Sequence, residues 1–204
     1  QLEETKSLLE SEAIPVLAVL ADVSDYEGCK LLFAKIEETF GMVDVLVNNA
    51  GISHIGLFTD MTPAEWNHVL DVNLGSVLNC THLAVPAMVS EKDGVILNIS
   101  SMSAIRGIPD PVNNNGIYTA TKFATNGFTE CMQKYLLKYG IRVTALCPGS
   151  TATSWWTRWT HSFDTDAMLP VDTLADIVEL IVTSPEKVLF KQLQVLPTVE
   201  IDNF

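Results

Sequence analysis

The sequence predicts an α/β protein that folds as a doubly wound parallel sheet with helices on both faces. Short apolar runs typical of buried strands alternate along the chain with longer stretches of helical periodicity. This alternation indicates βαβ units, in which each helix crosses one face of the sheet. The chain has no internal repeat, low-complexity tract or linker, so we expect a single domain over residues 1–204.

The first forty residues are predicted to hold two helices with a strand between them. Residues 1–12 have a helical composition, and residues 14–21 form a near-continuous apolar run, expected to be a strand buried on both faces. A helix is expected over residues 25–40, with Ser24 as its N-cap and Gly41 at its end.

The next section contains a strand followed by a long helical pattern. An apolar run over residues 42–47 predicts the second strand. The helical pattern starts with Thr62 as N-cap and Pro63 in the first turn, breaks near Asn73 and ends near Val89.

The remaining chain continues the alternation. We expect strands over 94–99, 141–147 and 192–196, and helices over 118–139 and 171–183. In such sheets, ligands bind beyond the carboxyl ends of the strands. The polar and glycine-containing segments that follow these strands should therefore converge on one edge of the sheet.

A pair of residues in the fourth helical segment suggests catalytic chemistry. Tyr118 and Lys122 are four residues apart, so their side chains can share one helix face. A nearby ammonium would lower the pKa of the tyrosine towards the range useful for acid–base catalysis. By itself the pair also fits an ordinary helix face with a lysine extended to solvent.

Composition narrows the possible partners. The net charge is −13, which argues against nucleic acid and anionic membranes. No apolar run reaches the length of a membrane span, and no secretion signal begins the sequence. The four cysteines have no paired spacing, so we interpret them as small buried side chains in a reducing, cytoplasmic compartment. The four histidines are scattered, so no metal site is expected.

Several motifs in this order resemble the short-chain dehydrogenase/reductase family. They are Asn48-Asn49-Ala50-Gly51 after a strand, Asn73 in a helix, Ser101 after the next strand, Tyr118 with Lys122, and Pro148-Gly149 with Thr153. The resemblance covers nearly the whole chain. It implies a Rossmann-like fold and an NAD(P)-dependent oxidoreductase that interconverts an alcohol and a ketone or aldehyde by hydride transfer.

The resemblance also implies a role for each catalytic residue. Tyr118 would exchange a proton with the substrate oxygen, and Ser101 would hydrogen-bond that oxygen. Lys122 would lower the Tyr118 pKa and bind the nicotinamide ribose, and Asn73 would hold a water in a proton relay. Read singly, Asn73 fits a helix–backbone hydrogen bond, Ser101 a strand terminus or cap, and Asp22 a turn residue.

The same resemblance assigns the cofactor site. NADP is slightly favoured over NAD, and the expected contacts are Asp22, Val23, Asn49, Ala50, Gly51, Tyr118, Lys122, Pro148, Gly149, Thr151 and Thr153. Residues 151–170, rich in tryptophan, are predicted to form a mobile lid, with a fixed helix as the alternative. The tail over residues 185–198 resembles members that act on 3-hydroxy and 3-oxoacyl substrates.

Two features depart from the family pattern. The glycine-rich strand–turn–helix–strand unit that opens family members does not precede Gln1, so the chain looks N-terminally truncated. We therefore expect weak dinucleotide binding, with residues 16–20 and 43–47 exposing an apolar face or strand edge. Residues 108–116 look like an inserted loop at the mouth of the site.

Other classes of function fit the sequence less well. A hydrolase built on Ser101 would need a Gly-x-Ser-x-Gly turn, which the sequence lacks. A catalytically inactive family member, acting as a binding or assembly module, is the stronger alternative. The expected partners are a small alcohol or carbonyl substrate and a second copy of the chain, in a homodimer or homotetramer. Candidate residues for that contact are His68, Leu74, Val77, Leu78 and Phe128.

Overall fold

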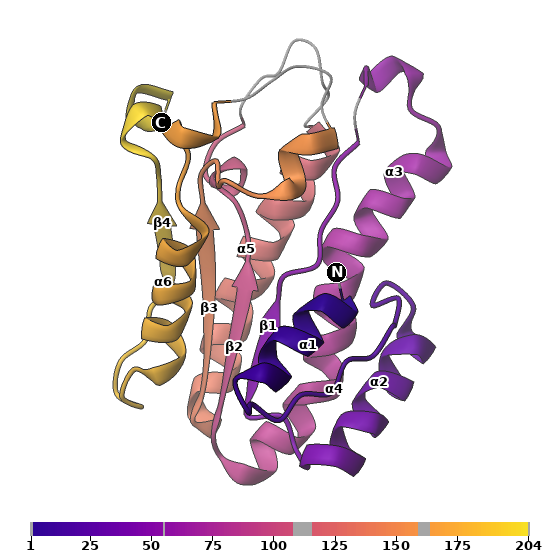
Figure 1. Cartoon of the computed structure of the whole chain (residues 1–204), viewed down its shortest axis with the longest axis vertical. Coiled ribbons are helices and arrows are strands. Elements are labelled where there is room, and N and C mark those ends of the chain that lie inside the picture. The colour runs from indigo at the N-terminus through magenta and orange to yellow at the C-terminus, as the bar shows by residue number, and fades with distance from the viewer. Residues whose placement is uncertain (1, 55, 108–115, 159–163, 204) are drawn as a thin grey trace.

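The structure, a computed structural model, describes residues 2–54, 56–107, 116–158 and 164–203, with the backbone alone at 158 and 201–203. Nearly all of the predicted insertion at 108–116 lies outside these residues, as do Trp159 and His161. Figure 1 shows the chain with the sheet upright and the helices around it.

Four parallel strands form the sheet, and their spatial order follows their order in the chain. They are β1 (Val45–Asn48), β2 (Gly94–Ile99), β3 (Ile141–Pro148) and β4 (Gln192–Val195). The predicted strands at 94–99, 141–147 and 192–196 are confirmed within one residue. The strand predicted at 42–47 begins only at Val45, where β2 comes alongside as its hydrogen-bonding neighbour.

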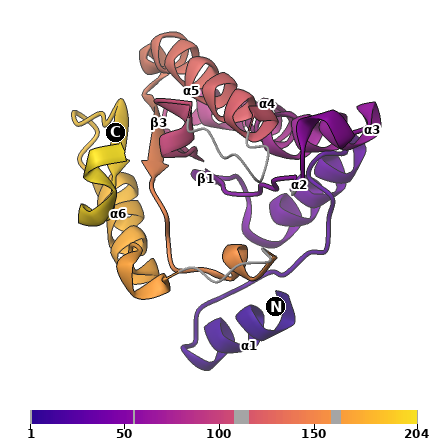
Figure 2. The same cartoon turned by 90° about the horizontal axis from the view of Figure 1, so that it is seen from above.

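The helices lie on both faces of this sheet, as predicted. Figure 2 shows α4 and α5 over one face and α6 over the other. The helices are α1 (Leu2–Ser11), α2 (Tyr26–Phe40), α3 (Pro63–Leu70), α4 (Ser76–Glu91), α5 (Gly116–Leu136) and α6 (Val171–Thr183). The break expected near Asn73 is a π-helical segment, Asp71–Gly75, between α3 and α4.

The helix ends follow local chemistry, with one correction. Thr62 caps α3 through a reciprocal capping box with Glu65, as expected. Gly41 ends α2 at φ +85°, a conformation that suits glycine. Ser24, however, is not the N-cap of α2. Its hydroxyl is bound to Asp22 at 2.6 Å, and Asp25 caps the helix instead, accepting from the Gly28 N–H at 3.0 Å.

The core is divided between the two faces of the sheet. One cluster joins α4 and α5 to β2 and β3, with Met88, Ile96 and Leu136 fully buried. The other joins α6 to the same strands through Leu97, Leu146 and Ile181. β2 and β3 are therefore covered on both sides, and their carboxyl ends are held rigidly.

The strand predicted over residues 14–21 is wrong. These residues form no strand, Ile14 is 48% exposed and Leu20 is 92% exposed. A strand requires a hydrogen-bonding neighbour, and no described segment pairs with this one. The expected exposure of an apolar edge is confirmed, because Val45 and Val47 on β1 are 43% and 40% exposed.

Two further expectations need correction. The helical run Pro63–Glu91 is, by length and composition alone, long and apolar enough to cross a membrane. In the structure its side chains Val69, Ala84 and Met88 are buried in the protein. Of the four cysteines, Cys131 is exposed, so it is not a buried packing residue.

Candidate active site

Helix α5 carries the predicted catalytic pair at the carboxyl edge of the sheet. Thr121, Thr125 and Thr129 form a buried stripe four residues apart and turn one face of the helix towards the core. Lys122 lies beside this stripe and is buried, while Tyr118, one turn earlier, is half-buried. The Lys122 ammonium lies 5.5 Å from the centre of the Tyr118 ring.

Ser101, the serine expected to bind the substrate oxygen, lies close enough to Tyr118 to influence its pKa. The two hydroxyl groups are therefore near each other, although their residues belong to different elements. Burial raises the pKa of Tyr118, and the Ser101 side chain opposes this rise. The expectation that Lys122 lowers the Tyr118 pKa is wrong in this structure, since the ammonium approaches the ring and is hydrogen-bonded elsewhere.

The Lys122 ammonium donates a hydrogen bond to the Ile99 carbonyl, at the end of β2, over 2.8 Å. Burial lowers the pKa of Lys122 to about 8, and the neighbouring Cys147 partly opposes this shift. An ammonium has three N–H donors. Within the described part of the chain, no hydrogen-bond partner engages the other two.

Asn73 ties the π-helical segment to both sides of the site. Its amide oxygen accepts from the Ile52 N–H at 2.7 Å, and its amide nitrogen donates to the Ile52 carbonyl and to Thr121. A Cβ on Gly51 would lie 3.5 Å from the Asn73 oxygen and 3.8 Å from the Lys122 nitrogen. Asn73, Gly51 and Lys122 are therefore neighbours, as the predicted site requires, and the interpretation of Asn73 as a backbone-binding residue also holds.

The two serines after β2 have different surroundings. Ser100 is buried, and its hydroxyl donates to the Lys122 carbonyl over a long 3.4 Å. The Ser101 hydroxyl accepts from the Ser103 N–H at 3.1 Å and so begins a short 3-10 helix. Ser101 thus serves as a cap and is also close enough to Tyr118 to influence its pKa.

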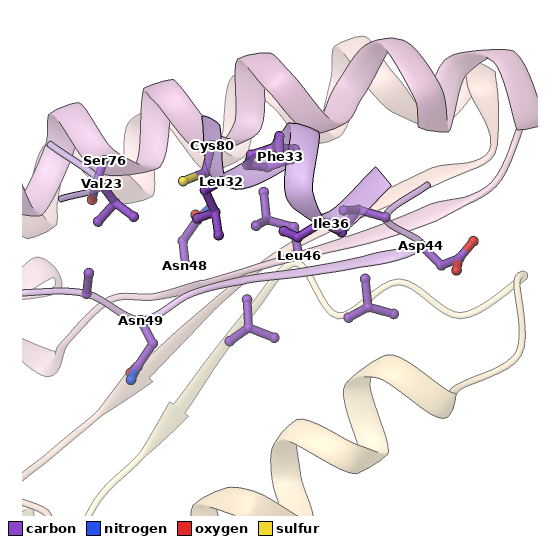
Figure 3. Close-up of a pocket in the computed structure, with 14 residues that line it drawn as sticks. Val23, Leu32, Phe33, Ile36, Asp44, Leu46, Asn48, Asn49, Ser76 and Cys80 are labelled. Atoms are coloured by element: carbon purple, nitrogen blue, oxygen red, sulfur yellow. The ribbon is translucent and has the colours of Figure 1, made fainter. Parts of the chain in front are cut away.

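The predicted adenosine side of the cofactor site lies along β1. Val23, Asn49 and Ala50 face a cavity of about 520 Å³ between β1, α2 and α4, shown in Figure 3. Asp22 does not line this cavity. Its carboxylate accepts from the Ser24 backbone and hydroxyl, which lowers the pKa of Asp22 and matches the interpretation of a turn residue.

The predicted nicotinamide side follows β3. A Cβ on Gly149 would lie 2.7 Å from Glu200 and 2.9 Å from Pro197, so only glycine fits there. The Thr151 hydroxyl donates to the Gly149 carbonyl, and Thr153 accepts from the Trp155 N–H. Pro148 ends β3 and pairs with Val195 on β4.

Sequence reasoning missed several residues of the site. Trp155 lies on a 3-10 helix, Ser154–Arg158, and its ring is 5.8 Å from that of Tyr118. The Ile99 and Ile52 carbonyls act through the backbone, so their identity carries no signal. The tryptophan-rich composition of residues 151–170 is the signal that could have identified Trp155. That composition predicts a lid but does not specify the contact with Tyr118.

No metal site accompanies these groups in the part of the chain that the structure describes. No three His, Cys, Asp or Glu side chains there lie close enough together to hold a metal ion. Hydroxyl, ammonium and amide groups surround this edge of the sheet.

Several known proteins with similar sequences have reductase names. The profile of the short chain dehydrogenase family matches residues 1–162. The 3-oxoacyl-[acyl-carrier-protein] reductase of Staphylococcus aureus is 36% identical over 141 residues, which cover 69% of this chain and 56% of that protein. The acetoacetyl-CoA reductase of Shinella zoogloeoides is 41% identical over 132 residues, 65% of this chain and 53% of that protein. The chain thus spans a little over half the length of these relatives.

Solved structures share the fold. A metagenomic short-chain oxidoreductase in complex with NADP superposes with a TM-score of 0.80 at 26% identity, covering 97% of this chain and 82% of that one. A 3-oxoacyl-[acyl-carrier protein] reductase from Brucella melitensis with bound NAD superposes with a TM-score of 0.79 at 29% identity, covering 95% and 75%. The family profile, the fold and the order of the site residues agree, and the chain belongs to the short-chain dehydrogenase/reductase family of oxidoreductases.

Proposed function

We propose that these residues form the catalytic part of an NAD(P)-dependent oxidoreductase that interconverts an alcohol and a ketone or aldehyde. The observation that supports this most is the position of Tyr118, with the buried Lys122 ammonium 5.5 Å from its ring and Ser101 close enough to influence its pKa. Two neighbouring hydroxyl groups can bind a single substrate oxygen and stabilise the negative charge that develops there.

The residues of the chain are better suited to bind the nicotinamide half of a dinucleotide than the adenosine half. Lys122 has unused donors in a buried position, next to a glycine that leaves room beside it. These groups would hold the nicotinamide ribose, and Thr151 and Thr153 would lie on the carboxamide side. When bound, the nicotinamide supplies or accepts a hydride. NADP remains slightly favoured over NAD, and both occur with structural relatives.

The proton has a defined path in the reducing direction. As the carbonyl carbon gains a hydride, the Tyr118 hydroxyl donates its proton to the substrate oxygen, and Ser101 keeps its hydrogen bond to that oxygen. A raised pKa keeps Tyr118 protonated at neutral pH, so it acts as an acid. We assign Lys122 and Asn73 to holding the ribose and relaying the replacement proton.

The test is Tyr118→Phe, which removes only the phenolic oxygen. The protein is assayed as the 204-residue chain and with the glycine-rich unit of a relative fused before Gln1. We expect kcat for reduction of acetoacetyl-CoA by NADPH or NADH to fall roughly 100- to 10,000-fold in the fused protein, while cofactor affinity measured by NADPH fluorescence stays within about twofold.

Tyr139→Phe is the matched control, because Tyr139 lies on the 3-10 helix Leu137–Tyr139 that follows α5, far along the chain from Tyr118. It should retain the parental rate. Near-parental turnover in Tyr118→Phe would rule out its acid–base role. If no version of the protein transfers hydride, the second candidate, an inactive binding or assembly module, is supported by the open edge of β1.

We also propose a cytoplasmic homodimer or homotetramer formed through α4 and α5. These helices flank a groove lined by Leu78, Phe128 and Tyr135, and Leu78 is 41% exposed. Val77, named among the candidate contact residues, is only 4% exposed, so it belongs to the core and not to this face. Light scattering that gives the monomer mass at micromolar concentration would contradict the assembly.

A further inference from the structure

Trp155 occupies a defined place beside the proposed acid–base residue. Its indole lies 5.8 Å from the Tyr118 ring at an interplanar angle of 51°. Ring centres between about 4.5 and 7 Å apart mark a true aromatic contact. Both side chains are half-buried, so the indole covers part of the phenol without sealing it from solvent.

The backbone around Trp155 holds this position from several points. Its own N–H donates to the Thr153 hydroxyl at 3.3 Å, and the neighbouring Trp156 indole donates to the Thr151 carbonyl at 2.7 Å. Two further hydrogen bonds tie Ala152 to Leu169 and Leu169 to Ser150, each at 2.9 Å. The indole is therefore presented by an anchored turn.

The Trp155 indole differs chemically from the rest of the site. Ser101, Tyr118 and Lys122 supply polar groups for one substrate oxygen. An indole offers a broad apolar surface and a single N–H donor. A carbonyl compound whose oxygen sits between the two hydroxyls would bring one substituent towards this surface, since Trp155 adjoins Tyr118.

We propose that Trp155 determines substrate specificity by forming the apolar wall for the group next to the reacting carbonyl. The preferred substrates are ketones or aldehydes with an aryl or alkyl group there, in preference to polyols and charged hydroxy acids. This inference rests on the proposed function, because it assigns a surface to the substrate of that reaction.

Two measurements test it. The first is the ratio of kcat/KM for acetophenone to that for dihydroxyacetone, in the fused protein defined above. We expect Trp155→Ala to lower this ratio roughly tenfold and Trp155→Phe to lower it less than threefold. Trp66→Ala is the matched control, since that indole stacks on Phe58 elsewhere in the molecule and the ratio should not change.

The second measurement needs no turnover. Ultraviolet titration of tyrosinate in the 204-residue chain, with Tyr118→Phe as the blank for each variant, reports the Tyr118 pKa. Removing the indole admits water, so that pKa should fall in Trp155→Ala and stay near the parental value in Trp66→Ala.

The outcomes separate the two proposals. A working enzyme with an unchanged substrate ratio in Trp155→Ala overturns the wall and leaves the proposed function standing. A fused protein that reduces neither of these ketones nor acetoacetyl-CoA refutes the proposed function and the wall with it, even if the pKa of Tyr118 moves. A lower ratio together with a lower Tyr118 pKa supports both.

Discussion

Two apolar segments of the chain, β2 and residues 14–21, show what an apolar run needs in order to become a strand. β2 has a neighbour on each side and is buried along almost its whole length. The run at 14–21 is just as apolar, yet it has no neighbour among the described residues and forms no strand. β1 lies between these cases, with one paired edge and two half-exposed valines. Pairing, and not composition alone, therefore determines strand formation here.

The prediction with the largest expected effect compares β2 with residues 14–21 by truncating one side chain in each. Ile96→Ala, in the fully buried part of β2, should lower the free energy of unfolding by about 2–5 kcal/mol, because it removes a transfer term and leaves a cavity. Leu20→Ala, at a residue that is 92% exposed, should change it by less than about 0.5 kcal/mol.

Urea unfolding followed by circular dichroism gives both values under the same conditions. Equal losses in the two variants would mean that the segment at 14–21 is packed in solution, and the contrast drawn above would be wrong.

The second prediction tests whether catalysis and adenosine binding are also separated, between the packed part of the sheet and the open edge of β1. The proposed catalytic groups lie on the packed side, whereas the cavity expected to hold the adenosine lies along the open edge of β1. Residues 1–204 include no glycine-rich turn of the kind whose amides bind a diphosphate, and their net charge of −13 opposes an anionic ligand.

We expect the 204 residues to bind NADPH roughly 100-fold more weakly than the fused protein, equivalent to about 2.7 kcal/mol. Calorimetric titration of both proteins at the same salt concentration measures the difference. Micromolar binding by the 204-residue chain would show that the turn is dispensable.

The smallest expected effect concerns the charge buried on the packed side. The pKa of Lys122 is lowered to about 8 in the folded chain, from 10.5 when exposed. Between these values the unfolded chain binds a proton that the folded chain does not, so the free energy of unfolding rises with pH. Below pH 8 both states are charged and this contribution to the slope vanishes.

Lys122→Met removes this titration while keeping a side chain of similar length. From pH 7.5 to pH 9 the parental protein should gain about 1 kcal/mol relative to the variant. Taking the difference cancels most of the contribution of the cysteines, which titrate in both proteins. Parallel stability curves would show that Lys122 is solvated or compensated in the folded state.

Local signals in the sequence predicted much of the fold. Thr62, Gly41 and the apolar run at 94–99 act through their own backbone or through immediate neighbours, and their elements were predicted correctly. The run at 14–21 and the cap at Ser24 failed for one reason: each depends on a partner that a local pattern does not specify. For Ser24 the partner is Asp22, which takes its hydroxyl.

The same difference between local signals and distant partners holds for the site. The family motifs identified Ser101, Tyr118 and Lys122, and the structure brings them together. The pKa shift of Tyr118 was predicted with the wrong sign, because a motif does not state that the Ile99 carbonyl takes the ammonium. Trp155 was missed as a neighbour of Tyr118, since that contact joins two segments nearly forty positions apart.

The π-helical segment at Asp71–Gly75 limits which deletions the chain can tolerate. A wide turn of this kind acts as one residue inserted into an α-helix. Since each helical residue turns the chain by about 100°, the insertion resets the angular phase between α3 and α4. Deleting Val72 would join the two helices smoothly, yet it would rotate Asn73 away from Ile52. The irregular turn thus sets a geometric limit on tolerated deletions, which point substitutions alone would not reveal.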